Sequence, residues 1–303
     1  MVYTVTCNPA LDYVMWADDV APGRINRAEK TALTYGGKGI NVSAVLTRLG
    51  VPTRALGFAA GFTGDKLKAL LTADGIAHDF VDLASGETRI NVKVKAAEEL
   101  DFNAAGPAVT TADIALLMHK LDALRPGDFL VLAGTVSKNL PQDLYERMLT
   151  RLEGWGVQVV VDAERSLLRE TLRFRPFPIK PNHHELGALF GGVELHSAKE
   201  IATYAKKLQA EGARNVLVSR AADGAVLVDE TGNCHVIGNA PGTVRNSVGC
   251  GDSMVAGFIA GWLQRGDYVH ALRLGAACGN ATAFSDMLAT KEEIDKALAY
   301  FEE

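Results

Sequence analysis

Along most of this chain, short apolar runs alternate with longer stretches whose apolar residues recur at helical spacing. From about residue 110 onward, the short runs predict buried strands at 129–133, 157–161, 177–180 and 215–219. The longer stretches predict amphipathic helices at 111–124, 140–154, 197–211 and 268–284. Continuous apolar strands separated by helices are typical of a parallel sheet covered on both faces. We therefore expect an α/β fold whose ligands gather at the carboxyl ends of the strands.

The first third of the chain follows a different pattern, because after an opening strand its apolar and polar residues alternate. The segment 89–95 places Ile90, Val92 and Val94 on one face and Arg89, Asn91, Lys93 and Lys95 on the other. Such strands do not belong inside a doubly covered sheet. We expect one core domain over residues 1–303, with a small lid sheet formed by two excursions at about 12–36 and 88–104. The apolar face of this lid needs a partner, either the main body or a second subunit.

Composition and charge narrow the class of protein. A length of 303 residues supports a full-sized core, and 48% hydrophobic residues are ordinary for a globular chain. A net charge of −5 argues against a surface that binds nucleic acid, so an anionic substrate needs a local cluster of basic residues. The four cysteines form no CxxC pair, which predicts neither a zinc site nor a disulfide framework. No signal peptide or membrane-spanning run is visible, so we expect a cytoplasmic protein without a membrane partner.

Residues 246–252, Asn-Ser-Val-Gly-Cys-Gly-Asp, precede a run of small and apolar residues that predicts a buried helix. Gly249 and Gly251 lack the Cβ atoms that would keep a ligand away from the turn. The turn therefore presents unpaired N–H groups and a positive helix end, which suit a phosphoryl group or the charge developed during its transfer. A carboxylate there would repel a resting phosphate, so Asp252 is better suited to accept a proton from an attacking hydroxyl. An ordinary N-cap aspartate is the alternative.

A second glycine cluster, Tyr-Gly-Gly-Lys-Gly-Ile-Asn at residues 35–41, lacks the spacing of a Walker-type nucleotide loop. Its glycines bring the backbone close to a small ligand, to which Lys38 offers a charge and Asn41 an amide. Asp12 follows the first strand, where a carboxylate suits the vicinal hydroxyls of a sugar and a turn aspartate is equally at home. Arg89, on the polar lid face, suits bidentate binding of a phosphate, with a solvated surface arginine as the alternative.

Residues 180–185, Lys-Pro-Asn-His-His-Glu, close a strand and begin a helix. Asn182 and Glu185 fall on one side of that helix, where an amide and a carboxylate would orient water around Mg²⁺. A capping box has the same spacing. His183 and His184 are adjacent and point apart on a helix, so we expect surface residues rather than zinc ligands.

Two further segments fit a nucleotide. Residues 219–224, Ser-Arg-Ala-Ala-Asp-Gly, join two strands either as a plain hairpin or as a loop along phosphates or ribose. Residues 275–283 form a helix dense in small residues, which either packs tightly or leaves room for a flat ring such as adenine. Asn280 would then offer hydrogen bonds to that ring.

Over its whole length the chain resembles the ribokinase-like PfkB family of carbohydrate kinases. Segment 36–41 matches the family's N-terminal signature, 249–252 its C-terminal signature and 180–185 its magnesium-associated NxxE element. Segments 8–12, 88–93, 252–257 and 279–284 are similar to the branch of 1-phosphofructokinases and tagatose-6-phosphate kinases. The resemblance implies a three-layer α/β/α fold with a mainly parallel central sheet and a small β-sheet lid.

The resemblance also implies an activity, which is the ATP- and Mg²⁺-dependent phosphorylation of a ketohexose monophosphate. Fructose 1-phosphate, converted to fructose 1,6-bisphosphate, is the expected substrate and tagatose 6-phosphate the alternative. A catalytically silent sugar-phosphate sensor and a nucleoside kinase are more distant alternatives. The resemblance implies that Asp252 is the general base and that the N–H groups of Gly249, Cys250 and Gly251 form an anion hole. The sugar would be contacted by Asp12, Gly37, Lys38 and Asn41, and its phosphate would be held by a clamp of Arg89 with Lys38 and Arg27. Mg²⁺ would be contacted by Asn182 and Glu185, and ATP by Ser219, Gly224 and Asn280.

The chain departs from the family pattern at the start of the C-terminal signature. Asn246-Ser247 stands where the family usually has Asp-Thr, so a contact of these side chains with a monovalent cation is left open. Cys250 replaces the commoner alanine and keeps the backbone donor. The resemblance is also compatible with a homodimer through the lid sheets, with other dimers and with a monomer.

Overall fold

The main sheet runs through the whole body of the protein. In the computed structural model, which describes residues 1–18, 20–137, 139–163 and 165–302, this sheet has nine strands. In spatial order they are β13 (Cys234–Ile237), β12 (Ala225–Val228), β11 (Asn215–Ser219), β10 (Pro178–Ile179), β9 (Gln158–Asp162), β8 (Phe129–Ala133), β1 (Val2–Thr6), β4 (Thr53–Ala60) and β5 (His78–Leu83). Neighbours from β11 to β5 are parallel, and the two antiparallel pairings are those of β12. The expected mainly parallel sheet is confirmed.

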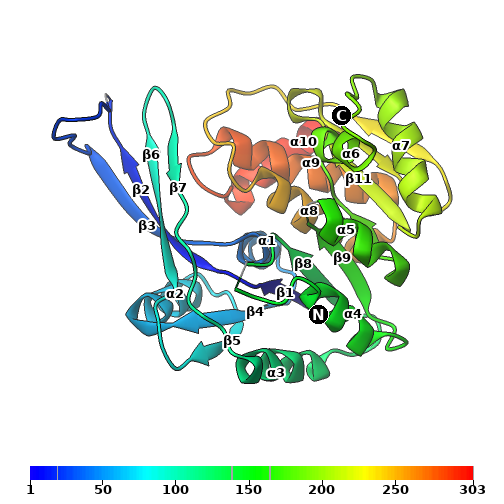
Figure 1. Cartoon of the computed structure of the whole chain (residues 1–303). Coiled ribbons are helices and arrows are strands. Elements are labelled where there is room, and N and C mark those ends of the chain that lie inside the picture. The colour runs from blue at the N-terminus through cyan, green and yellow to red at the C-terminus, as the bar shows by residue number, and fades with distance from the viewer. Residues whose placement is uncertain (19, 138, 164, 303) are drawn as a thin grey trace.

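Helices cover both faces of this sheet, so the fold has three layers (Figure 1). One face carries α3 (Thr111–Lys120), α4 (Leu144–Leu152), α5 (Arg165–Thr171), α6 (His183–Leu189) and α7 (Ala198–Ala210). The other carries α1 (Lys38–Arg48), α2 (Gly61–Ala73), α8 (Cys250–Arg265), α9 (Tyr268–Phe284) and α10 (Lys291–Glu302). Short 3₁₀ turns lie at Leu121–Ala123, Leu172–Phe174 and Ala221–Asp223. In the described parts of the chain, no helix has both the length and the apolar character needed to cross a membrane.

The alternation of strands and helices starts earlier in the chain than the hydrophobic pattern predicted. Strands β8 and β11 and helix α9 lie where they were expected, whereas β4, β5 and the helices α1 and α2 extend the parallel sheet within the first third. The sequence pattern hid β5 because it is an edge strand with half-exposed polar residues. It hid β4 because that strand is built largely from alanine and glycine. The different pattern of the first third therefore belongs to the lid strands alone.

The lid is a second, four-stranded sheet in the described chain. Its strands are β3 (Lys30–Gly36), β2 (Ala10–Trp16), β6 (Arg89–Lys95) and β7 (Leu100–Phe102), in that order, with β2 and β6 parallel. Figure 1 shows them projecting from the body beside the main sheet. Two separate excursions of the chain thus build one lid.

The polar face of the lid, rather than its apolar face, is turned inward. Asp12 and Asn91 on β2 and β6 are buried, with 8% and 5% of their surface exposed. Tyr13, Ile90 and Phe102 on the opposite face are 36%, 40% and 62% exposed. Leu11 lies on the same face as Tyr13 but is 2% exposed and packs with Leu67 and Leu71 of α2. The main body therefore covers one end of the apolar face and leaves the part around Tyr13, Ile90 and Phe102 exposed.

Candidate active site

Four charged side chains meet at the carboxyl ends of the central strands. Asp162 ends β9, Lys180 follows β10, Lys38 begins α1 and Asp252 lies in the first turn of α8. The buried carboxylate of Asp162 lies 3.5 Å from Nζ of Lys38 and 3.4 Å from Nζ of Lys180. Asp252 is also buried, and its Oδ2 accepts a hydrogen bond of 2.8 Å from the amide of Asn41. The topology thus gathers two cations and two carboxylates from four separate segments.

Asp252 is a more basic carboxylate than usual. Burial is the main cause that raises its pKa to about 6, and the negative charge of Asp162 adds to it. The hydrogen bond from Asn41 and the charges of Lys38 and Lys180 lower the pKa in part. A carboxylate with this pKa is ionised at neutral pH and still basic enough to take a proton, as a general base must be.

Lys38 lies among carboxylates at the inner end of the site. Burial alone would lower its pKa, but the charges of three nearby carboxylates outweigh burial and raise it; these belong to Asp162, Asp252 and Glu185. The ammonium therefore stays charged close to Asp252. Its ion pair with Asp162 keeps it at the carboxyl ends of the central strands, and its expected contact with the substrate's own phosphate stays a prediction.

The turn before α8 brings its backbone close to these charges. Gly249 is the N-cap of α8, with a φ of 81° that favours glycine, and no side chain caps the helix there. A Cβ on Gly251 would lie 3.0 Å from Nζ of Lys180, so glycine lets the buried lysine reach the turn. The first N–H groups of α8, those of Cys250 among them, have no partner within the helix. These N–H groups can therefore donate hydrogen bonds to a ligand bound next to Lys180 and Asp252.

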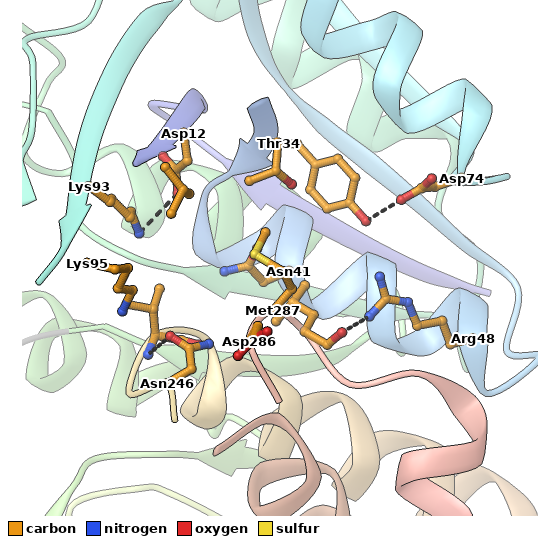
Figure 2. A pocket seen from close by; sticks show the side chains of 14 residues that line it. Asp12, Thr34, Asn41, Arg48, Asp74, Lys93, Lys95, Asn246, Asp286 and Met287 are labelled. Carbon is orange, nitrogen blue, oxygen red and sulfur yellow. Dashed lines mark hydrogen bonds and ion pairs between the residues drawn. The ribbon is translucent and has the colours of Figure 1, made fainter. Parts of the chain in front are cut away.

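A cavity of about 260 Å³ opens between the lid and the body (Figure 2). Its lining comes from the lid strands, α1 and two loops, and includes Asp12, Thr34, Asn41, Arg48, Lys93, Lys95, Asn246 and Asp286. Asp12 accepts a hydrogen bond of 2.9 Å from Nδ2 of Asn91 and lies 3.1 Å from Nζ of Lys93. Gly37 is the N-cap of α1, the helix that carries Asn41. Asp12 and Asn41 thus face one cavity, and Asn41 connects it to Asp252.

The two arginines predicted for the phosphate clamp lie in different surroundings. Nη1 of Arg89 donates a long hydrogen bond of 3.4 Å to the carbonyl of Ala104, and its Nε is buried without a partner among the described residues. Burial lowers the pKa of Arg89, and the charge of Asp12 partly offsets that effect. Arg27 is exposed in the loop between β2 and β3, and it is not among the residues that line the cavity. The structure therefore places Arg89 near the charge of Asp12, although neither Arg89 nor Arg27 lines the cavity.

A second cavity of about 390 Å³ lies on the other side of the α8 turn. Its lining includes Asn182, Ser219, Gly224, Asn239, Cys250, Gly251, Gly279 and Asn280. Asn280 accepts a hydrogen bond of 2.6 Å from the N–H of Ala240 and donates one of 2.9 Å to Asn239, so its amide already holds the neighbouring loop. Asn280 also lines this cavity, and its expected hydrogen bond to a ring stays a prediction.

The helix start at residues 182–185 forms the capping box that its spacing allowed. Asn182 and Glu185 form a capping box, because Oδ1 of Asn182 accepts from the N–H of Glu185 and Oε2 of Glu185 accepts from the N–H of Asn182. His183 and His184 do not point apart as expected, since their ring centroids lie 3.8 Å apart and both line the second cavity. The capping box fixes the position of Glu185 relative to Asn182, which lines that cavity.

Sequence reasoning did not single out Asp162, Lys180 or Lys93. A signal was available for the first two, because a charged residue directly after an apolar parallel strand lies at the ligand-binding edge of the sheet. Lys93 was placed on the polar face of the lid, but only the register of the strands shows that it reaches Asp12. The partners of these residues are distant in sequence, so spacing could not reveal them.

Two cavities on either side of one buried carboxylate, with an N–H-rich turn and two lysines beside it, define a phosphoryl-transfer site. Residues 6–293 match the family described as pfkB family carbohydrate kinase, and the chain belongs to that family. It is therefore a kinase, a phosphotransferase whose acceptor is an alcohol group.

Several relatives narrow the comparison. The 1-phosphofructokinase of Bacillus subtilis (strain 168) is 41% identical over 299 residues, which cover 98% of this chain and 97% of that protein. The D-tagatose-1-phosphate kinase of Bacillus licheniformis is 33% identical over 296 residues, which cover 98% and 97%. The structure of phosphofructokinase-2 from Escherichia coli in complex with substrates and products superimposes with a TM-score of 0.94 at 26% identity, covering 100% of this chain and 99% of that one. That enzyme has also been solved with fructose-6-phosphate, with potassium and in a tetrameric inhibited form.

Proposed function

We propose that this protein transfers a phosphoryl group from ATP to O6 of fructose 1-phosphate and so forms fructose 1,6-bisphosphate. The observation that carries the proposal is the turn at residues 246–251, which lines both cavities and leads into the buried Asp252, with the lid's basic face in the first cavity. The similarity to a 1-phosphofructokinase at 41% identity supports the choice of substrate. In this proposal the acceptor hydroxyl of the substrate meets Asp252, and its resident phosphate meets the basic face of the lid.

In the proposed reaction, Asp252 accepts the proton of the acceptor hydroxyl as that oxygen attacks the γ-phosphorus. The bond from the γ-phosphorus to the oxygen of the β-phosphate breaks, and ADP leaves. The N–H groups of Gly249, Cys250 and Gly251 stabilise the charge on the migrating phosphoryl group. Lys38 and Lys180 lie beside this turn and add two positive charges there. Because phosphoryl transfer requires mainly positioning and charge stabilisation, these groups are sufficient for the protein's share of the reaction.

The sugar is proposed to lie in the cavity beneath the lid. Asp12 and Asn41 bind its hydroxyls, and Gly37 lets the backbone approach it. Arg89 extends the positive charge of the lid next to Asp12, and its unpartnered Nε is a free donor for phosphate among the described residues. The lid covers the sugar and keeps water from competing for the phosphoryl group.

ATP is proposed to occupy the second cavity, along Ser219 and Gly224, with Asn280 holding the loop that borders it. The donor set suits Mg²⁺, because Glu185 keeps Oε1 outside the capping box and Asn182 has a second lone pair on Oδ1. These two residues would hold the ion, most of whose other ligands are water and phosphate oxygens, and the bound ion would neutralise phosphate charge. A metabolic kinase that draws on ATP is best placed in the cytoplasm.

A monovalent cation has weaker support in this chain. The side chain of Asn246 forms two hydrogen bonds within its own turn. It donates one of 2.9 Å to the carbonyl of Val248 and accepts one of 3.1 Å from the N–H of Val248. The potassium complex of the Escherichia coli relative keeps the idea worth testing. Rates measured in potassium and in tetramethylammonium buffers answer the question directly.

The competing substrates differ in where they carry the resident phosphate. The relatives include a kinase of tagatose 1-phosphate and an enzyme solved with fructose-6-phosphate, and tagatose 6-phosphate remains the alternative that the sequence suggested. Steady-state rates with ATP and Mg²⁺ should be measured on fructose 1-phosphate, both tagatose phosphates, fructose 6-phosphate and free fructose. The highest kcat/KM is expected for fructose 1-phosphate. A higher value for any other sugar would replace it as the substrate, and no turnover with any sugar despite binding would favour a sensor.

The role of Asp252 has its own test. Asp252→Asn keeps the shape of the side chain and removes the base, so kcat should fall about 10²- to 10⁴-fold while the sugar still binds. Calorimetric titration of the variant with fructose 1-phosphate checks the binding. Unchanged turnover would exclude Asp252 as the base.

We also propose that the apolar outer face of the lid pairs with a second copy of this chain. The strand register aligns Leu33, Tyr13, Val92 and Phe102 in one row across the four strands. Such a row of exposed apolar side chains is typical of an interface. A tetrameric form of the Escherichia coli relative supports an assembly of this kind.

A further inference from the structure

The cations that line the cavity beneath the lid differ in how they are engaged. They are Arg48, Lys93 and Lys95. Nη1 of Arg48 donates to two carbonyls of the 288–289 loop, at 2.7 and 2.8 Å. Lys95 forms a 2.6 Å ion pair with Glu99, a surface residue. Arg48 is therefore bound to the main body, and Lys95 to a residue at the rim of the lid. Lys93 is the remaining lining cation and is turned to the interior of the cavity.

Lys93 is bound to the carboxylate that is proposed to bind the sugar. Its Nζ lies 3.1 Å from Oδ2 of Asp12, and only 13% of its side chain is exposed. Asn91 holds the other oxygen of the same carboxylate. An ammonium has three donors, and the ion pair with Asp12 uses one of them. The others remain for a ligand that binds next to Asp12.

The strand register places Lys93 and Arg89 on opposite sides of Asp12. Asp12 is paired with Asn91, while Arg89 and Lys93 are two residues before and after Asn91 on the same face of β6. Arg89 does not line the cavity and donates to the carbonyl of Ala104. Lys93 lines the cavity, so its charge is the one that a phosphate inside the cavity would meet.

We infer that Lys93 binds the resident phosphate of the substrate and thereby selects a phosphorylated ketohexose over the free sugar. Asp12 binds a hydroxyl next to that phosphate, and the hydrogen bond from this hydroxyl releases part of the ammonium from Asp12. The inference rests on the proposed function, because it names the residue that reads the phosphate of the proposed substrate. It adds Lys93 to a clamp that had been expected to consist of Arg89 with Lys38 and Arg27.

The test compares fructose 1-phosphate with free fructose in the wild type and in Lys93→Met, which keeps the length of the side chain and removes its charge. For fructose 1-phosphate, kcat/KM should fall about 10- to 100-fold, mainly through KM, because a charged hydrogen-bond partner is lost. For free fructose it should change by less than about threefold, since that sugar has no phosphate for the ammonium to contact. Lys199→Met is the control, because Lys199 is an exposed lysine on α7 that lines neither cavity, and it should leave kcat/KM for both sugars within about threefold.

Further measurements separate the possible outcomes. Inorganic phosphate should compete with fructose 1-phosphate in the wild type and lose that ability in Lys93→Met, while Lys93→Arg should keep the preference for the phosphorylated sugar. An equal loss on both sugars would mean that Lys93 only positions Asp12, and an unchanged KM for fructose 1-phosphate would also overturn the inference. If the wild type turns over no sugar phosphate, the proposed function is wrong. If the wild type is active and Lys93→Met has the same kinetics, only the inference about Lys93 is wrong.

Discussion

At the scale of single residues, the chemistry of Asp252 depends on its neighbours more than on its own type. An exposed aspartate is a weak base, whereas this one is buried, lies near the charge of Asp162 and is held by Asn41. Lys38 and Lys180 moderate the same effect, so the carboxylate stays ionised at neutral pH. The pKa that results suits proton abstraction near neutral pH.

This raised pKa predicts an acidic limb in the pH profile. Because the pKa of Asp252 is about 6, the base becomes protonated as the pH falls through that value, and kcat/KM should fall tenfold per pH unit below it. Asp162→Asn removes a charge that raises this pKa, so the limb should move to lower pH. The second ionisation of the sugar phosphate also lies near pH 6, but the substitution cannot move it. A limb at the same pH in both proteins would assign it to the substrate.

Gly36 shows a second dependence at this scale, because its missing Cβ makes room for Asp12. A Cβ built there would lie 2.5 Å from Oδ1 of Asp12. Gly36→Ala should displace that carboxylate and raise KM for the sugar phosphate about tenfold or more, since losing a hydrogen bond from a charged group costs about 1.5–3 kcal/mol. Gly238→Ala is the control, because its Cβ would meet nothing within 4 Å. Equal KM values for the two variants would contradict the role given to Asp12.

At the scale of elements, the close packing of α8 on α9 positions the N–H-rich turn. A Cβ on Gly257 would lie 2.5 Å from the carbonyl oxygen of Leu274 and 2.7 Å from Sγ of Cys278. Gly275 faces the same contact from α9, at 3.0 Å from the carbonyl oxygen of Met254. The small residues that suggested room for a ring thus serve close helix packing in this part of α9.

Gly257→Ala should therefore destabilise the fold. The backbone carbonyl of Leu274 cannot move aside as a side chain could, so overpacking is expected to cost about 1–3 kcal/mol. Replacing a helical glycine with alanine gains about 1 kcal/mol at most, which is not enough to compensate. Urea unfolding of the variant beside wild type and Gly238→Ala measures the difference. A urea midpoint of Gly257→Ala at or above that of the wild type would contradict this prediction. It would show that α8 and α9 can move apart without loss of stability.

At the scale of the whole molecule, the two faces of the lid have different tasks. The inner face presents Asp12 and Lys93 to the cavity, with Asn91 bound to Asp12, and the outer face presents an apolar row that the described chain leaves exposed. Association through the outer face would fix the position of the strands that carry the inner one. Assembly and substrate binding would then depend on the same sheet.

Light scattering tests the proposed assembly. The wild type should have the mass of a homo-oligomer, and Tyr13→Glu should dissociate it, because a charge in the middle of the apolar row must be desolvated. Tyr300→Glu is the matched control, since Tyr300 is a 49% exposed aromatic residue on α10. A monomeric wild type, or equal dissociation by both substitutions, would exclude the lid as the interface.

Local patterns were enough to predict the architecture and the two glycine-rich turns. The parallel sheet followed from apolar strands that alternate with helices, and β8, β11 and α9 lie where the pattern placed them. Glycine spacing pointed to the turn before Asp252, and alternation along β6 separated the polar from the apolar face. These features depend on interactions between residues close in sequence, such as helical periodicity and backbone conformation, and can therefore be read without a fold.

Tertiary structure alone decided which of these features meet. Asp162 and Lys180 join Lys38 and Asp252 only because strand order brings four separate segments to one edge of the sheet. The pKa of Asp252 arises from burial and from charges up to 214 residues away in sequence; no local pattern contains them. The same holds for the lid, whose polar face proved to be the inner one because Asp12 and Lys93 pair across β2 and β6. The pKa of Asp252 and the orientation of the lid depend on desolvation and on contacts between residues distant in the chain. These contacts cannot be derived from the order of the residues.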